Sequence, residues 1–297
     1  MNRPAIERLA RWRQAWSGLI TSDSPAHRWI MAILSVAVVA GAIWSASRLD
    51  ISTDDLSWLP LSGAAALSIL GPVISAAEYR AGLQLIRRDT DLRTAVQVSV
   101  FGTLANVLPL PGGFLVKMKA MTEQGARART AAGAQLLVGI VWLAMSGVLV
   151  AIALPRWRLV LVGATAVMFG VAAFMAYRNR YAPKALVAVI VIEALFLATA
   201  AARFYLVLVG LGIEVTGRGA LALAASGPLA AATGLLPGSL GVFEAISAGL
   251  AALADMEPES GFLGALVLRI LTYLMLLPWV WWSRSRPGAG PGTAPGS

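Results

Sequence analysis

Long apolar runs separated by short polar segments fill the chain between residues 29 and 282. A helix needs about 20 apolar residues to cross a bilayer. Runs near that length occupy residues 29–47, 61–77, 131–154, 159–176, 185–211 and 262–282. Two further runs, 95–121 and 220–254, contain proline and glycine, which end helices. The pattern predicts an all-α polytopic membrane protein with about six transmembrane helices and two broken segments.

The two breaks share the letters Leu-Pro and Pro-Gly: residues 108–119 read LPLPGGFLVKMK and residues 235–244 read LLPGSLGVFE. A broken helix leaves backbone groups unpaired, and at membrane depth it persists only where protein or a water-filled cavity covers it. One interrupted segment in each half of a membrane protein is typical of a transporter binding site. The rest of the chain is interpreted as a scaffold for these two breaks.

The positions of lysine and arginine favour re-entrant hairpins over kinked full spans. If both broken segments cross the membrane, 14 of the 24 Lys and Arg residues lie inside and 8 outside; if each returns to its own side, 18 lie inside and 4 outside. The positive-inside rule favours the second arrangement. It predicts an inverted repeat with halves 29–154 and 159–282, one hairpin entering from each side.

The chain ends differ from the single integral membrane domain, residues 29–282. Residues 1–28 are basic and carry apolar residues at helical spacing, which indicates a cytoplasmic amphipathic helix on the membrane surface or a solvated tail. The helix of the second run is expected to continue as far as Arg88. Residues 283–297 are rich in Gly, Pro and Ala, which predicts a disordered tail. Both termini are expected to be cytoplasmic.

Composition removes several classes of function. The chain is 58% apolar and 13% charged, with mean hydropathy +0.74, no cysteine and one histidine, His27. Disulfides and thiolate chemistry are excluded, metal sites built from several His or Cys lack ligands, and we expect no cofactor. The net charge of +9 fits cytoplasmic loops and anionic lipid headgroups rather than nucleic acid.

Candidate substrate-binding residues surround the two breaks. A helix that restarts after a break points its N–H groups at the tip, where they attract an anion such as a phosphate, and glycine lets a ligand approach the backbone. Two interpretations of Lys117 stay open: its ammonium meets a lipid phosphate, or it is an ordinary charge flanking the membrane. Lys119 is interpreted as an ordinary flanking charge. Asn106 bonds freed carbonyls or a headgroup. The set is Asn106, Pro111, Gly112, Gly113, Lys117, Pro237, Gly238, Ser239, Gly241 and Glu244.

Four ionisable residues lie at membrane depth: Glu193, Arg203, Glu244 and Arg269. Such groups are costly in lipid and pair with one another or face a cavity. Glu244 is within reach of Arg269 or Arg203, and the pair either holds the hairpin or takes part in proton coupling or headgroup binding. Glu193, nearer the inner side, is a second candidate for a proton relay.

No catalytic residues are proposed. Residues 1–297 contain no nucleophile elbow, phosphate-binding loop or HExxH motif, and serine without a base is weak evidence for catalysis. No polar loop is long enough to build an enzyme active site. We therefore expect a protein that is not an enzyme.

The second break and the last span resemble the transmembrane region of lysylphosphatidylglycerol synthase, through residues 236–242 (LPGSLGV), Glu244 and residues 269–273 (RILTY). Ser239 stands where the family has glycine. The first half follows the order of the family's motif residues with Asn106, Leu108-Pro109, Gly112-Gly113 and Lys117. It departs from the family in two ways: the acidic residue after the first glycine is missing, and lysine stands in place of arginine. The resemblance implies a flippase-like module without the soluble synthase domain.

Together these features predict a lipid translocase, or a lipid-binding transporter-like protein, of the bacterial inner membrane. Its substrate would be an anionic or zwitterionic phospholipid, glycolipid or polyprenyl-linked lipid. The alternative is a non-transporting scaffold that docks a lipid-modifying enzyme. The expected partners are membrane lipids and either such an enzyme or a glycosyltransferase, with no nucleic acid.

Overall fold

The structure is a computed structural model, and it describes residues 25–50, 56–106, 112–233 and 241–284. Within these ranges the regular structure is helical. The elements are α2 (Pro25–Arg48), α3 (Trp58–Leu85), α4 (Leu92–Ala105), α5 (Gly112–Glu123), α6 (Ala128–Ala153), a short 3-10 turn η2 (Pro155–Trp157), α7 (Arg158–Arg178), α8 (Pro183–Gly210), α9 (Gly217–Ala224), α10 (Ser226–Thr233), α11 (Val242–Leu253) and α12 (Pro258–Arg284).

Five segments are long and apolar enough to cross a membrane: Trp58–Leu85, Ala128–Ala153, Pro155–Arg178, Pro183–Gly210 and Pro258–Trp282. The remaining expected span, residues 29–47, lies within α2. Large apolar side chains on α7, such as Leu159 and Val160, point away from the protein, as lipid-facing residues do. The chain is therefore a multi-pass, all-α membrane protein, as predicted. α3 ends at Leu85, three residues before the expected Arg88.

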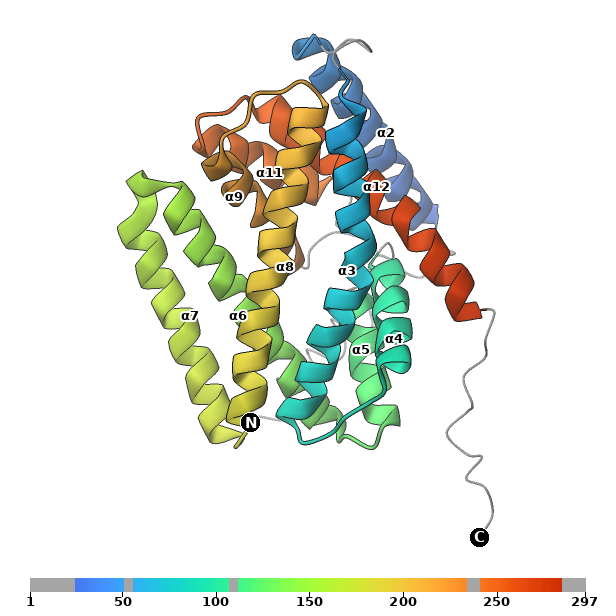
Figure 1. Ribbon diagram of the computed structural model, residues 1–297, viewed down its shortest axis with the longest axis vertical. Coiled ribbons are helices and arrows are strands. Elements are labelled where there is room, and N and C mark those ends of the chain that lie inside the picture. Colours follow the sequence, from blue (N-terminus) through green and yellow to red (C-terminus); the bar gives the residue numbers. More distant parts are fainter. Residues whose placement is uncertain (1–24, 51–55, 107–111, 234–240, 285–297) are drawn as a thin grey trace.

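The centre of the fold is the antiparallel pair α3 and α8, which lie side by side along their length (Figure 1). A backbone bond ties the pair at each end: Ser57 N–H donates to the Gly210 carbonyl at 2.9 Å, and Ala182 N–H donates to the Leu85 carbonyl at 3.2 Å. These bonds define two ends of the molecule. The end near Leu85 and Ala182 carries most of the loop arginines and lysines, and we call it the basic end.

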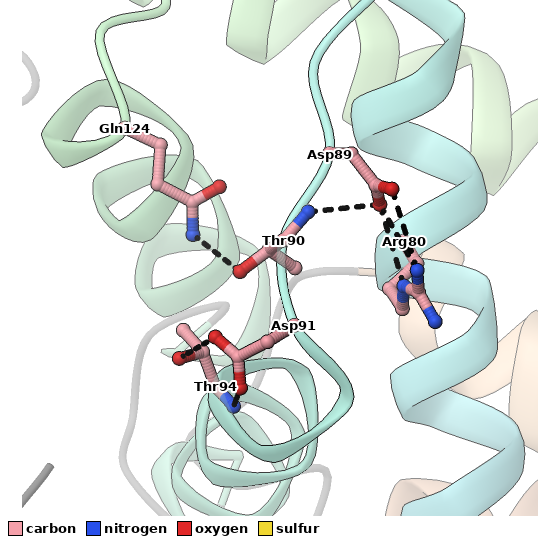
Figure 2. A network of polar contacts seen from close by, with 6 residues as sticks. All are labelled: Arg80, Asp89, Thr90, Asp91, Thr94 and Gln124. Carbon is pink, nitrogen blue, oxygen red and sulfur yellow. Dashed lines mark hydrogen bonds and ion pairs between the residues drawn. The ribbon is translucent and has the colours of Figure 1, made fainter.

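Hairpin 1, formed by α4 and α5, leaves the basic end and returns to it. The Arg88 guanidinium, just after α3, donates to the backbone carbonyls of Gln124 and Gly125, just after α5. Figure 2 shows a side-chain contact at the same junction: the Gln124 amide donates to the hydroxyl of Thr90, which precedes α4, at 3.4 Å. Both ends of the hairpin therefore lie at one end of the molecule, and the prediction of a re-entrant segment is confirmed.

Side chains at the same junction fix where α4 begins (Figure 2). The Asp91 carboxylate accepts a hydrogen bond from the Thr94 amide at 2.9 Å and another from the Thr94 hydroxyl at 2.6 Å. Such a cap satisfies N–H groups that have no partner within the helix. Asp89 accepts from the Arg80 guanidinium, so the loop after α3 is held against α3 itself.

Hairpin 2, formed by α9, α10 and α11, enters from the opposite end (Figure 1). α9 starts after the end of α8, α11 packs against α9, and Gly219 lies directly against Met256 in the turn before α12. The arm of hairpin 2 that precedes the break consists of two helices, α9 and α10, where one was expected. Pro228 explains it, because proline lacks an N–H and its ring clashes with the carbonyl four residues earlier.

The two halves repeat the same order with opposite direction: a flanking helix, a long central helix, a hairpin and a long closing helix. The first half is α2 to α6 and the second is α7 to α12. The flanking helix α2 lies against α12, and the corresponding α7 lies against α6. The predicted inverted repeat is thus present in the described residues: hairpin 1 packs in a buried cluster with Tyr79 and Leu83 of α3, and hairpin 2 packs in a separate one with Phe204 of α8.

Candidate functional site

At the first break, a side chain of the protein itself accepts a hydrogen bond from the start of α5. The Asn106 side-chain oxygen accepts a hydrogen bond from the Gly113 N–H at 2.8 Å. Asn106 therefore bonds a freed amide, where the sequence had indicated a carbonyl or a headgroup. A β-carbon on Gly112 would overlap the backbone of Ala105, and one on Gly113 would lie 2.6 Å from the Asn106 oxygen. In this structure the two glycines let α4 and α5 approach each other.

Lys117 lies beyond this turn and forms an ion pair with Glu78 on α3, with a distance of 2.9 Å between the Lys117 Nζ and the Glu78 Oε1. The two side chains are only 13% and 17% exposed. Lys119, two residues along, is 77% exposed and reaches Glu123 on its own helix at 3.7 Å. The two lysines therefore differ in kind: one faces the protein interior and the other faces out.

Glu193 on α8 completes this group of charges. It is 2% exposed, and it is close enough to Glu78 and Lys117 to interact electrostatically with both. We call Glu78, Lys117 and Glu193 the hairpin-1 cluster. By helix rise, the three lie about 9–15 Å from the basic ends of α3, α5 and α8. With all groups ionised, two carboxylates face one ammonium.

At the second break, Glu244 pairs with Arg269, which was one of its two predicted partners. The Glu244 Oε1 lies 3.1 Å from the Arg269 Nε, and Glu244 is fully buried. Its other oxygen accepts from the Gly241 N–H at 2.9 Å, at a residue whose φ of 81° favours glycine. The Arg269 guanidinium also lies over the Phe243 ring.

Arg203 does not pair with Glu244. It donates instead to the hydroxyl of Thr272 and to the backbone carbonyl of Leu268, both on α12. Its Nε is buried and has no hydrogen-bond partner among the described residues. We call Glu244, Arg269 and Arg203 the hairpin-2 cluster; it holds one carboxylate and two guanidinium groups, of which only that of Arg269 pairs with the carboxylate.

Two members of each cluster lie on corresponding elements of the two halves and have opposite charges, whereas the third members, Glu193 on α8 and Arg269 on α12, do not correspond. Glu78 and Arg203 each occupy the 21st position of a 28-residue central helix, α3 in one half and α8 in the other. Lys117 and Glu244 each lie on the returning arm of a hairpin, and both arms are 12 residues long. One cluster has a formal charge of −1 and the other of +1, one near each end of the central helix pair.

The N–H groups expected to attract an anion are already used at Gly113 and Gly241, because Asn106 and Glu244 accept from them. The binding candidates Pro111, Pro237, Gly238 and Ser239 lie outside the described residues, as do residues 1–24 of the expected amphipathic helix. The role of these residues stays a prediction.

Sequence reasoning missed two features. Glu78 was not among the candidate residues, since it follows the apolar run 61–77, yet its carboxylate pairs with Lys117. A hollow of about 650 Å³ also lies at the basic end, at the turn between α7 and α8. Its lining combines arginine and tyrosine side chains, among them Arg178, Arg180 and Tyr181, and burial raises the pKa of Tyr181.

Comparison with known proteins adds one finding. The family model described as Lysylphosphatidylglycerol synthase TM region matches residues 136–279. No curated protein and no solved structure matches the chain. The matched region includes Glu193 and the whole hairpin-2 cluster, and it begins after the Glu78–Lys117 pair. The match indicates a membrane lipid-related function.

Proposed function

We propose that the chain is a lipid translocase of the bacterial inner membrane, because the model of the Lysylphosphatidylglycerol synthase TM region family matches residues 136–279. Its substrate is a lipid with an anionic or zwitterionic headgroup: a phospholipid, a glycolipid or a polyprenyl-linked lipid. In this proposal the protein is not an enzyme, and both termini are cytoplasmic. The basic end then faces the cytoplasm, in line with the positive-inside rule.

The observation that carries the proposal is the surplus positive charge of the hairpin-2 cluster. Arg269 pairs with the Glu244 carboxylate, whereas Arg203 donates only to Thr272 and to the Leu268 carbonyl and pairs with no carboxylate of the described residues. The Arg203 Nε is a buried donor without a partner in the described structure, and leaving such a donor unpaired costs about 1–3 kcal/mol. A phosphate oxygen is the acceptor that a guanidinium group binds best.

The repeat supports movement of that headgroup across the membrane. Hairpins that enter from opposite ends place polar groups in both halves of the bilayer, where charged side chains are rare unless they serve a pathway. Two halves of the same order can exchange their conformations, so a site open to one side becomes open to the other. The lipid tails would remain in the bilayer while the headgroup passes between the clusters.

The test is lipid translocation by the purified protein in liposomes. Lipids with a fluorescent headgroup label are placed in both leaflets, and a membrane-impermeant quencher reports how fast the inner pool becomes accessible. We expect faster loss of the protected pool with the protein than without it, for at least one of the lipid classes. Arg203→Gln should remove most of that gain, because it deletes the proposed phosphate contact.

Arg218→Gln is the matched control, since Arg218 lies at the exposed start of α9. Equal translocation by the wild-type protein and Arg203→Gln would contradict the role of Arg203. Absence of translocation for every lipid class would favour the scaffold hypothesis. That hypothesis predicts that removal of the basic loop 123–129 releases a bound lipid-modifying enzyme or glycosyltransferase.

A further inference from the structure

We propose that the hairpin-1 cluster is a proton-binding site, in which Glu193 takes up and releases one proton beside the Glu78–Lys117 ion pair. The inference rests on the proposed function only for the use of the proton, which is to couple hairpin movement to lipid movement. The binding itself is a property of three side chains on α3, α5 and α8. It is tested without any lipid substrate.

The charges of the hairpin-1 cluster do not balance when all three groups are ionised. The Lys117 ammonium is 2.9 Å from Glu78, so these two groups neutralise each other. Glu193 is 2% exposed, and its carboxylate belongs to none of the ion pairs among the described residues. An isolated buried carboxylate is very costly, and in practice such a group takes a proton or a cation. The third charge of this cluster therefore requires a positive partner that the described residues do not supply.

The elements packed against α8 determine which charges act on Glu193. α3 contributes Glu78, and Lys117 reaches the same place from α5; these are the two charges that act on Glu193. The charged residues of the other neighbouring helices lie elsewhere: Arg129 is at the exposed start of α6, Arg218 is at the exposed start of α9, and Arg269 on α12 pairs with Glu244. Arg203, ten residues along α8, is about 15 Å away by helix rise.

The three residues of the hairpin-1 cluster lie on different parts of the fold. Lys117 belongs to the returning arm of hairpin 1, whereas Glu193 and Glu78 belong to the central helices. If the hairpin carries Lys117 away, both carboxylates favour protonation; if Lys117 approaches, Glu193 favours release. Protonation and hairpin position are therefore linked, and by thermodynamic reciprocity each biases the other.

Access also fits a proton that arrives from the basic end. Glu78 and Lys117 remain 17% and 13% exposed, whereas Glu193 is 2% exposed. The ion pair is therefore the more accessible part of the hairpin-1 cluster. A proton can pass along this polar face, and the apolar side chains of α8 separate Glu193 from the hairpin-2 cluster.

The experiment is infrared spectroscopy of the full chain in lipid nanodiscs, following the carbonyl stretch of protonated carboxylic acids. We expect Glu193→Gln to lose about one protonated carboxyl relative to wild type at neutral pH. Lys117→Met should gain one, because Glu78 loses its counterion. Glu123→Gln, an exposed carboxylate on the same hairpin arm as Lys117, should match the wild type.

Two further measurements keep the result decisive. Glu193→Asp retains an acid, so its protonated band should persist at a shifted frequency even if the Gln variant folds poorly. Identical wild-type and Glu193→Gln spectra, with both proteins folded, would overturn the proposal. It would also be overturned if added Na⁺ removed the wild-type band at constant pH, since the site would then hold a metal cation. Neither outcome depends on lipid translocation, so each proposal can fail separately.

Discussion

The Glu244–Arg269 pair allows a quantitative prediction about how hairpin 2 is held. Glu244 is fully buried, its Oε1 lies 3.1 Å from the Arg269 Nε, and the Arg269 side chain is 14% exposed. Removing one partner of a buried ion pair costs about 3–5 kcal/mol, because the other charge is left uncompensated. We expect Arg269→Met and Glu244→Gln each to lower the free energy of unfolding by about 3 kcal/mol, at the lower end of that range.

The double variant Glu244→Gln/Arg269→Met should lose much less than the sum of the two single variants. Once the pair is gone from both sides, no buried charge remains unpaired, so the coupling energy should reach about 2 kcal/mol or more. The assay is equilibrium unfolding in mixed micelles with increasing denaturing detergent, followed by tryptophan fluorescence and circular dichroism. All four proteins of the cycle are measured under the same conditions.

The chain offers a matched cycle for comparison. Lys119 and Glu123 also form an ion pair, 3.7 Å apart on α5, but their side chains are 77% and 65% exposed. Exposed pairs of this spacing contribute about 0.3–0.5 kcal/mol. If the Glu244–Arg269 cycle gave a coupling energy as small as the Lys119–Glu123 cycle, the argument that a buried pair anchors hairpin 2 would be refuted.

Three other predictions follow from the fold. The chain has no cysteine, so Glu123→Cys and Glu257→Cys each introduce a single thiol. The two thiols should react with a membrane-impermeant reagent from opposite faces of the membrane, because the two hairpins enter from opposite sides. Labelling of both from the same face would exclude the inverted repeat. Gly112→Ala should lower the free energy of unfolding by about 1–3 kcal/mol, since the new methyl overlaps Ala105, whereas Gly139→Ala, with open space around it, should not destabilise the protein. Hydrogen bonds from the side chain and backbone of Thr94 lower the pKa of Asp91, so the cap contributes fully above the unfolded pKa of about 3.9 and its contribution is lost as pH falls through the folded value. Asp91→Ala should therefore cost about 0.5–2 kcal/mol at neutral pH and much less in acid, as measured by unfolding at the two pH values.

The fold was largely predictable because its strongest determinants are local in sequence. Apolar length identified five segments that the structure shows as candidate spans; four agree in their bounds within four residues, and the run 61–77 lies inside the longer Trp58–Leu85. Proline and glycine identified both breaks, and the asymmetry of Lys and Arg correctly favoured hairpins that return to their own side. The division between α9 and α10 was missed, although Pro228 is a visible reason for it.

The charged clusters were less predictable, because pairing depends on tertiary packing. Glu78 and Lys117 are 39 residues apart, and only the packing of α5 against the first central helix brings them together. Sequence alone left Glu244 with two possible partners, and the geometry of α12 selects Arg269 while Arg203 turns to Thr272. One signal was available: Glu78 and Arg203 hold the same position in matching helices.

The way the flanking helices are exchanged between halves has a consequence for how the protein is made. α7 follows α6 directly and packs against it, but α2 packs against α12, where Gly41 lies against Phe262. About 210 residues separate the end of α2 from the start of α12. At ribosomal rates of about 5–20 residues per second, α2 waits roughly 10–40 s in the membrane before its partner is synthesised. During that interval the surface of α2 that later meets α12 is open to lipid or to an insertion factor, so α2 is fixed in place only after most of the fold has been synthesised.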